Sequence, residues 1–393
     1  MKPTIRNIFH IDHLIVSVLT LCIIGLLVFL TVNLEFLNPV VRAAKSFSMT
    51  DIYYRIQNSG EVPVNQQITL VDITELTSRD RDKIAGVVNE ISSMNPTVLG
   101  VDIIFEGLTS NELGDTLLTE AFFSTPENTV LAYKLTDPDS LAKTFSHAVH
   151  SFFIDDTHNT EGTINVVNNP YHSMTSYPTY FILNGDTVYS LPVMIAQLLG
   201  TAPPKKKEFA INYRDTDFRV VDYKELSANR SAIENRIVLL GSAQMESDTH
   251  LTPLGQMPGM KVLAYSVLSV MEGDHISEAP FWVYLLWAVL AGWMTNVVDL
   301  LLTKRLERRK SAFVLFFLKS GIYSRLVSFV ILALFTYISF ILFTRFDYDL
   351  SSGLALSTSV LIGAGQQLYI GILSVLKKKN IMIWKKSIYA PII

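Results

Sequence analysis

The fold is decided by two apolar runs, ITLVDI at residues 68–73 and TVLGVDIIF at residues 97–105, together with the segment between them. Both runs are short and rich in β-branched residues, a composition that favours strands. Between them, from residue 78 to residue 94, apolar side chains recur at helical spacing, and Ser78 is placed to cap the first turn. This strand–helix–strand unit predicts two parallel strands in one sheet, with the helix on one face.

Further elements of the same kind follow along the chain. Residues 136–190 have few periodic apolar positions, so we expect loops and short strands there, in an order that the sequence does not give. These features predict an α/β domain with a mixed, partly parallel sheet and flanking helices. The other predicted strands are 129–134, 208–213 and 235–241, and the other predicted helices are 191–199, ended by Gly200, and 259–271, started by Pro258 and ended by Gly273.

The rest of the chain is too apolar for an ordinary soluble protein. Of its 393 residues 49% are hydrophobic and 17% are charged, and the mean hydropathy is +0.32. The run at residues 14–32 carries no charge, and at about 1.5 Å per residue it covers the roughly 30 Å hydrocarbon core of a bilayer. We predict four transmembrane helices, at residues 14–32, 281–302, 326–343 and 350–376.

Basic residues indicate the side of the membrane on which each segment lies, because Lys and Arg that flank a span are retained in the cytoplasm. They outnumber acidic residues in segments 1–13, 303–325 and 377–393, so both termini are predicted to be cytoplasmic. Residues 33–280 are then extracytoplasmic, and their 17 Lys and Arg against 31 Asp and Glu give a net charge of −14. That sign disfavours nucleic acid as a partner of this domain. The basic segments are expected to contact anionic headgroups of the lipid bilayer, with docking of a partner protein as the alternative.

Seven motifs occur in a fixed order along the predicted α/β domain: VDIT at 71–74, VLGVDIIF at 98–105, YSLPVMIA at 189–196, INYR at 211–214, IVLLG at 237–241, DTHLTP at 248–253 and MPGM at 257–260. Their order resembles the second CHASE family, the extracellular sensory modules of bacterial receptor kinases and cyclases. The resemblance covers roughly residues 40–280, and one amino-terminal span with three carboxy-terminal spans is similar to the family's usual arrangement. The chain departs from the family at residues 75–81, where a stretch rich in Trp and Pro is common, and at Leu263 and Tyr265.

The resemblance also implies a function. The family usually continues past its last span into a signalling domain, whereas this sequence stops at Ile393. We therefore expect a non-enzymatic sensory or scaffold protein of a bacterial inner membrane, without an effector domain. It would bind an unidentified extracytoplasmic ligand and act through a separate membrane or envelope protein. The alternatives are a membrane-anchored, metal-dependent hydrolase that uses an Asp cluster and a purely structural subunit of an envelope complex.

Three aspartates are candidate ligand-binding residues, because each follows or ends a predicted strand: Asp72, Asp102 and Asp248. Open α/β sheets bind ligands at the carboxyl ends of their strands, where these carboxylates would converge. Such a group would suit a hard cation or a polar ligand, or catalysis in the hydrolase alternative. The structural alternative is that each carboxylate caps a turn or a helix. Asp102→Asn would change the ligand response in the first case and impair folding in the last.

Other chemistry-bearing patterns are weaker. The single cysteine, Cys22, excludes an internal disulfide and a multi-cysteine zinc site. One local group has the composition of a metal site but lacks the HExxH pattern, so we interpret it as a solvated surface. The sequence thus predicts no cofactor, no metal site and no catalytic residue. The group consists of His147, His150, Asp155, Asp156 and His158.

Four polar side chains interrupt the predicted spans: Asn296 and Asp299 in the second, and Gln366 and Gln367 in the fourth. Polar groups at this depth usually face other helices or a pathway. Asp299 lies about one turn from Lys304, and we expect the two to pair near the inner interface.

Overall fold

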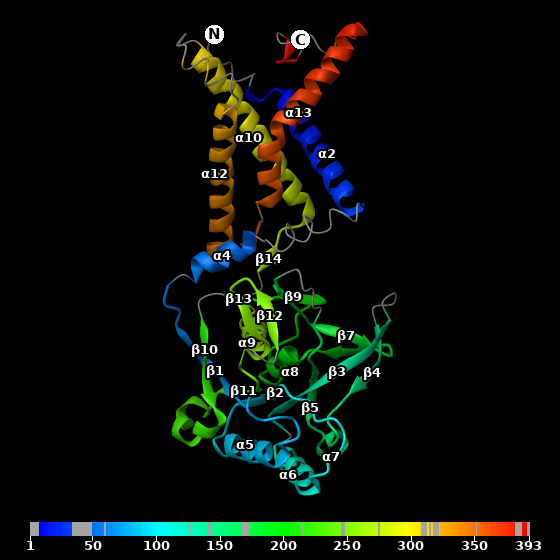
Figure 1. Cartoon of the computed structure of the whole chain (residues 1–393), viewed down its shortest axis with the longest axis vertical. Coiled ribbons are helices and arrows are strands. Elements are labelled where there is room, and N and C mark those ends of the chain that lie inside the picture. The colour runs from blue at the N-terminus through cyan, green and yellow to red at the C-terminus, as the bar shows by residue number, and fades with distance from the viewer. Residues whose placement is uncertain are drawn as a thin grey trace. The chain divides into compact units, whose positions relative to one another are not determined.

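The chain divides into two compact units, which Figure 1 shows in a computed structural model. A helical unit consists of Met1–Tyr53 and Ser277–Ile393, and an α/β domain consists of Tyr54–Ile276. Most of the predicted basic loop and residues 382–386 of the basic tail lie outside the described residues. The structure describes residues 8–33, 49–58, 60–125, 127–139, 144–166, 173–213, 216–244, 248–273, 276–307, 313, 316, 322–350, 352–381 and 387–390.

In its described part, the α/β domain is built on a nine-stranded sheet in the order β10-β1-β11-β2-β3-β4-β7-β8, with β5 paired to β3. The neighbouring strands from β10 to β3 are parallel, and so are the pairs β3–β5 and β4–β7. The pairs β3–β4 and β7–β8 are antiparallel. The predicted mixed, partly parallel sheet is therefore confirmed. Its strands are β1 (Val64–Asp72), β2 (Val98–Val101), β3 (Thr129–Asp139), β4 (Thr144–Val149), β5 (Thr160–Thr163), β7 (Tyr180–Leu183), β8 (Asp186–Tyr189), β10 (Asp217–Asp222) and β11 (Ile237–Gly241).

The first strand–helix–strand unit forms with one addition. β1 and β2 are parallel, but β11 lies between them and pairs with both, so that Leu239 stands beside Leu70 on one side and Gly100 on the other. The connecting helix α5 (Arg81–Ser93) begins three residues later than predicted, and Ser78 does not cap it. The reason is a turn before the helix, in which the carboxylate of Asp80 accepts the backbone N–H of Thr77 at 2.9 Å.

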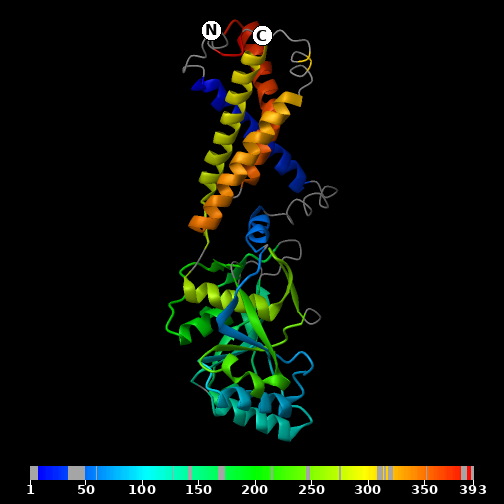
Figure 2. The same cartoon turned by 90° about the vertical axis from the view of Figure 1, so that its left-hand side faces the viewer.

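Helices cover both faces of the sheet, as Figures 1 and 2 show. Because side chains alternate along a strand, Val71, Val101 and Leu240 belong to one core with α5 and α6 (Glu112–Phe123). On the other face lie α8 (Leu191–Leu198) and α9 (Gly259–Glu272), and Ile195 of α8 packs beside Gly100. Burial of apolar side chains between three layers is the main source of stability in such a domain.

The remaining elements are short. A glycine with a positive φ angle lies just past the end of each of the helices α8 and α9. The angle is +83° at Gly200 and +63° at Gly273, a conformation that glycine adopts without strain. The predicted insertion contains β4, β5, β7 and β8 together with α7 (Ile154–Thr157) and β6 (Ser176–Pro178). β6 pairs with β9 (Glu208–Ala210), and β12 (Thr249–Thr252) forms a hairpin with β13 (Gly255–Pro258) just before α9.

Gly162 provides a test of the packing between β5 and α8. A Cβ added there would lie 2.5 Å from the Cα and 2.8 Å from the backbone nitrogen of Leu191. Gly162→Ala is expected to lower the free energy of unfolding by about 1–3 kcal/mol, because backbone cannot move aside as a side chain can. Gly86→Ala is the control: Gly86 is exposed in α5 with nothing within 4 Å, so alanine there should stabilise by about 0.5–1 kcal/mol. Thermal unfolding of both variants measures the contrast, and equal effects would contradict it.

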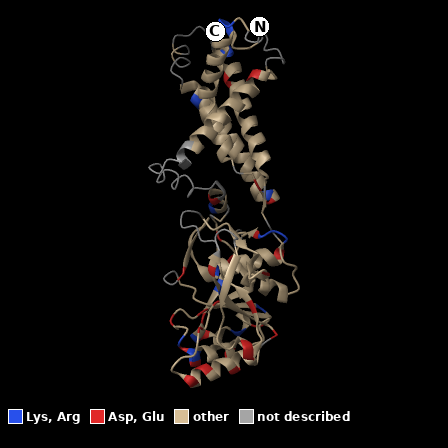
Figure 3. Ribbon diagram, turned by 90° about the vertical axis from the view of Figure 1, so that its right-hand side faces the viewer, with Lys and Arg blue, Asp and Glu red and all other residues tan. Residues whose placement is uncertain are grey.

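In the part of the helical unit that the structure describes, four helices are long and apolar enough to cross a membrane. They overlap the four predicted spans and extend beyond them by a few residues at most ends. Figure 3 shows that charged residues are sparse along the four helices. Close packing is visible at Gly365, where an added Cβ would lie 2.9 Å from the carbonyl oxygen of Val16. The elements of this unit are α2 (Ile11–Asn33), α10 (Phe281–Glu307), α12 (Ile322–Phe346), α13 (Gly353–Lys378) and the pair β14 (Ser277–Glu278) and β15 (Tyr348–Asp349), while α4 (Met49–Gln57) crosses the boundary between the units.

Candidate ligand-binding site

A cavity of about 210 Å³ lies where the carboxyl end of β2 meets the amino end of α9. Ligands of open α/β sheets usually bind at this kind of edge. One part of its wall is polar and the other is apolar. The polar residues are Asp102, Tyr177, Asp248 and His250, and Ile164, Val166, Met174, Gly259, Val262 and Leu263 complete the lining.

Asp102 enters the cavity from the sheet. It directly follows β2, its backbone N–H donates to the carbonyl of Leu240 at 2.9 Å, and strand alternation places it on the same face as Gly100. Its side chain is partly buried, and no hydrogen bond from a described residue reaches its carboxylate. Burial first, and then the charge of Asp248, raise the pKa of Asp102 to about 6, while His250 acts in the opposite direction. The carboxylate is therefore held in the cavity at a free-energy cost.

Asp248 and His250 form an ion pair on the other side of the cavity. His250 Nε2 lies 3.3 Å from Asp248 Oδ2, and the His250 side chain is only 10% exposed whereas that of Asp248 is 68% exposed. Their hydrogen bond raises the pKa of His250 and lowers the pKa of Asp248. The amino end of α9 begins at Gly259, whose N–H donates to the Asp248 carbonyl at 2.9 Å. A Cβ added at Gly259 would collide with Asp248 Oδ2, so a larger residue there would require this carboxylate to shift.

Tyr177 closes the cavity from β6. Its side chain is 4% exposed, and its ring stacks on that of Phe209 with centroids 6.0 Å apart. Within the described residues no hydrogen-bond partner meets its hydroxyl. Burial raises the pKa of Tyr177, and the charges of Asp102 and Asp248 raise it further. Tyr177 is therefore a second polar residue of this cavity whose side chain has no hydrogen-bond partner among the described residues.

Asp72 does not line this cavity. Its Oδ1 accepts the backbone N–H groups of Thr74 and Ala243, both at 3.0 Å, and the Thr74 hydroxyl at 2.5 Å. Burial opposes ionisation of Asp72, but these hydrogen bonds outweigh it and hold its pKa below the usual range. Asp72 thus ties the end of β1 to the segment after β11. Of the three predicted aspartates, the structure brings together Asp102 and Asp248, and sequence reasoning missed Tyr177 and His250.

The group of histidines and aspartates that resembles a metal site in composition does not come together as one. His147 lies in the strand β4, and its Nδ1 is 3.2 Å from Asp137 Oδ2. His150 Nδ1 lies 2.7 Å from Glu161 Oε2, and its ring stacks on Tyr133. Among the described residues there is no set of three or more His, Cys, Asp and Glu arranged to hold a metal ion.

The polar residues of the helical unit form a network that the sequence indicated only in part. Asn296 is buried in α10, and its Oδ1 accepts hydrogen bonds from Gln366 Nε2 and from the hydroxyl of Tyr389, the latter at 3.0 Å. Gln367 is exposed on α13. The buried carboxylate of Asp12 accepts the hydroxyls of Tyr369 and Ser387 at 2.8 and 2.7 Å and the N–H of Ile388 at 2.7 Å. Residues 387–390 are thereby fixed to the helical unit.

The expected pair of Asp299 and Lys304 does not form. Lys304 is exposed, and the described contacts include no ion pair between the two side chains. Five residues along a helix correspond to a rotation of about 140° beyond one full turn, so the two side chains project in different directions. One buried carboxylate oxygen of Asp299 has no hydrogen-bond partner among the described residues.

The Asp12 contacts predict how residues 387–390 are held. Asp12→Ala removes the acceptor of three hydrogen bonds, and each is worth about 0.5–1.5 kcal/mol, more where the acceptor is charged. Hydrogen exchange at the amide of Ile388 should then become at least about tenfold faster. Gln367→Ala, which changes an exposed polar side chain of the same unit, should leave that rate unchanged. An unchanged rate in Asp12→Ala would show that other contacts fix the segment.

Comparison with known proteins gives a family but no individual relative. A family model described as the CHASE2 domain matches residues 18–300, which is more than half of the chain. No curated protein and no solved structure matches the chain.

Proposed function

The chain belongs to the CHASE2 domain family, a family of sensory domains, and on that premise we propose that its α/β domain senses a small ligand bound in the cavity at Asp102. One observation carries this proposal: two polar groups, the carboxylate of Asp102 and the hydroxyl of Tyr177, face one cavity without a partner among the described residues. Polar groups without a hydrogen-bond partner lower the stability of the folded domain. A ligand that forms hydrogen bonds with them binds the folded domain and not the unfolded chain, so it stabilises the fold.

The proposed sensory function requires a location in a membrane and a partner protein. We propose that the protein lies in a bacterial inner membrane with its α/β domain extracytoplasmic, in agreement with the excess of Lys and Arg in segments 303–325 and 377–393, which flank the spans. Ligand binding would alter the packing of the membrane helices, which requires that the ligand bind one packing more tightly than another. A separate membrane or envelope protein would read the change, and the basic ends of α10 and α13 offer it a charged contact surface.

The hydrolase alternative receives less support. It requires three convergent carboxylates, whereas Asp72 is bound by its own turn and only Asp102 and Asp248 line the cavity. His250 balances the charge of Asp248, which leaves a single carboxylate for a divalent cation. Hard cations bind through six or more oxygen ligands, several of them charged. We therefore propose a binding function without catalysis for this cavity.

A ligand screen on the full-length protein in mild detergent tests the proposal. Small polar compounds of positive, negative and zero charge are added, and thermal unfolding of the protein is followed. A true ligand at about 100 times its dissociation constant should stabilise the fold by about 2.7 kcal/mol. Asp102→Asn should lose this response, and Asp186→Asn, the same change at an exposed position on β8, should keep it. Stabilisation that is equal in all three proteins would place the ligand elsewhere.

A second measurement tests the partner. The intact protein is purified from mild detergent by an affinity tag, and the proteins that remain bound are identified by mass spectrometry. A stoichiometric kinase, cyclase or envelope protein supports a sensor or scaffold that acts through another chain. A protein that purifies alone contradicts a stable complex, and a search for hydrolase turnover with divalent cations becomes the next step.

A further inference from the structure

We propose that the ligand of this cavity is a primary alkylammonium group, carried by a small aliphatic amine or by the lysine side chain of a peptide. The inference rests on the proposed function and adds the chemical class of the ligand. Its first support is charge. His250 pairs with Asp248 within the protein, at 3.3 Å, and opposes the charge of Asp102 only at longer range, because no ion pair among the described residues includes Asp102. The polar wall therefore carries one uncompensated negative charge, and a ligand with one positive charge neutralises it.

The second support is the match between donors and acceptors. An ammonium group has three N–H donors and no acceptor. The cavity presents acceptors without partners among the described residues: the two carboxylate oxygens of Asp102 and the hydroxyl oxygen of Tyr177. Both residues line the same cavity. A carboxylate ligand would instead meet the uncompensated charge of Asp102, which disfavours an anion.

The third support is the apolar part of the wall. Ile164, Val166 and Met174 come from the segments beside β5 and β6, and Val262 and Leu263 come from α9. These side chains offer a short hydrocarbon chain a place out of water. A bare divalent cation would use none of this surface and would need more oxygen ligands than the described residues place together. The small volume of about 210 Å³ suits a ligand of a few carbon atoms.

Three probes of similar shape test the inference: n-butylamine, n-butanol and butyrate, added to the full-length protein in detergent and followed by isothermal titration calorimetry at pH 7.5. Butylamine should bind at least about tenfold more tightly than butanol, because a charged hydrogen bond is lost with the alcohol, and butyrate should bind more weakly still. Asp102→Asn should reduce the affinity for butylamine at least about tenfold, and Asp186→Asn should not change it. A peptide with an internal lysine, compared with its acetyl-lysine form, distinguishes the peptide source from the free amine.

Each outcome of these titrations either supports or overturns the alkylammonium class. Preference for butylamine that depends on Asp102 supports the inference, and a lysine peptide that binds more tightly than butylamine assigns the ligand to a peptide. Equal or better binding of butanol or butyrate overturns the ammonium class while the cavity keeps its role as a ligand site. No saturable binding by any probe also overturns the inference. The broader screen then decides separately whether the α/β domain senses a ligand of another class in this cavity.

Discussion

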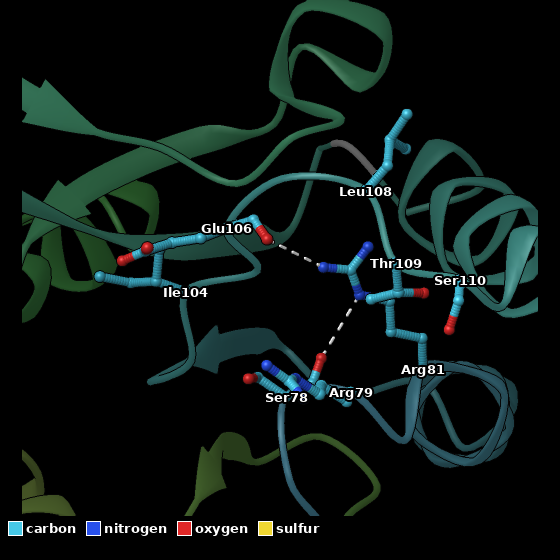
Figure 4. Close-up of a pocket in the computed structure, with 8 residues that line it drawn as sticks. All are labelled: Ser78, Arg79, Arg81, Ile104, Glu106, Leu108, Thr109 and Ser110. Atoms are coloured by element: carbon cyan, nitrogen blue, oxygen red, sulfur yellow. Dashed lines mark hydrogen bonds between the residues drawn. The ribbon is translucent and has the colours of Figure 1, made fainter.

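Arg81→Ala is expected to lower the free energy of unfolding of the α/β domain by about 3–5 kcal/mol, which is the usual result of removing one partner of a buried ion pair. Arg81 is only 2% exposed, although it opens the helix α5. Its Nη1 donates to Asp115 Oδ1 at 2.6 Å, and its Nη2 donates to the carbonyl of Gly107 at 2.7 Å. Figure 4 shows further bonds to the carbonyls of Glu106 and Ser78.

The large effect follows from what alanine leaves behind. Asp115 also accepts the N–H of Thr109 at 2.7 Å and its hydroxyl at 2.9 Å. Burial opposes ionisation of Asp115, but the bonds from Thr109 and Arg81 outweigh it and hold its pKa below the usual range. Without Arg81 the carboxylate stays buried and loses its cation, and the carbonyl of Gly107 loses its donor. The guanidinium also lies 4.4 Å from the ring centroid of Phe152, so a packing contact is lost as well.

Arg79 supplies the matched control. Both arginines line a cavity of about 560 Å³, which Figure 4 shows, but Arg79 is exposed whereas Arg81 is buried. Arg79→Ala should change the free energy of unfolding by no more than about 0.5 kcal/mol. Denaturant titration of the full-length protein, followed by far-ultraviolet circular dichroism, measures both variants. Similar losses in both would mean that the charge of this surface, and not the buried pair, stabilises the fold. The double variant Arg81→Met with Asp115→Leu should recover much of the loss, because no charge is left buried.

The local elements of the fold were predictable because their signals are local. The helical spacing of Ile84, Val88 and Ile91 and the Pro258–Gly273 boundaries of α9 are written in consecutive residues. The insertion of β11 between β1 and β2 was not predictable, since the pairing of Leu239 with residues far earlier in the chain leaves no local pattern. The start of α5 was missed because the turn at Asp80 competes with a cap at Ser78.

The candidate site was also predictable only in part. The rule that ligands bind at the carboxyl edge of the sheet predicted that Asp72, Asp102 and Asp248 converge, and of these the structure places Asp102 and Asp248 in one cavity. His250 carried a usable signal, because residues two apart in a strand project to the same side, and it stands two positions after Asp248. Tyr177 carried none: it lies in a segment without periodicity, and its place depends on the pairing of β6 with β9. From the sequence alone, Arg81 is expected to be a charged residue at an exposed end of a helix. Its burial depends on the loop around Gly107, whose carbonyl accepts a hydrogen bond from it.

Asp102→Asn is expected to stabilise the domain near neutral pH, by up to about 3 kcal/mol. Burial and the charge of Asp248 raise the pKa of Asp102 from an ordinary value of 3.8 to about 6, and each unit corresponds to about 1.4 kcal/mol. A carboxyl group whose pKa is raised in the folded state makes its full contribution to stability when the pH is below the pKa of the unfolded chain. This contribution is lost as the pH rises through the pKa of the folded state, about 6. Asparagine removes the charge, so the difference between variant and wild type should be small at pH 4, grow between pH 4 and pH 6, and level off above pH 7.

The groups that face Asp102 limit this gain without changing its sign. The charge of Asp102 contributes a little to the raised pKa of His250, so asparagine weakens the ion pair of His250 and Asp248 slightly, and Tyr177 stays neutral throughout. Denaturant titrations of wild type, Asp102→Asn and Asp186→Asn at several pH values measure the effect, and the last should run parallel to wild type. A variant less stable than wild type at pH 7.5 would assign Asp102 a structural role. A more stable variant that no longer binds ligand would mean that the carboxylate is kept for binding, since its charge opposes folding.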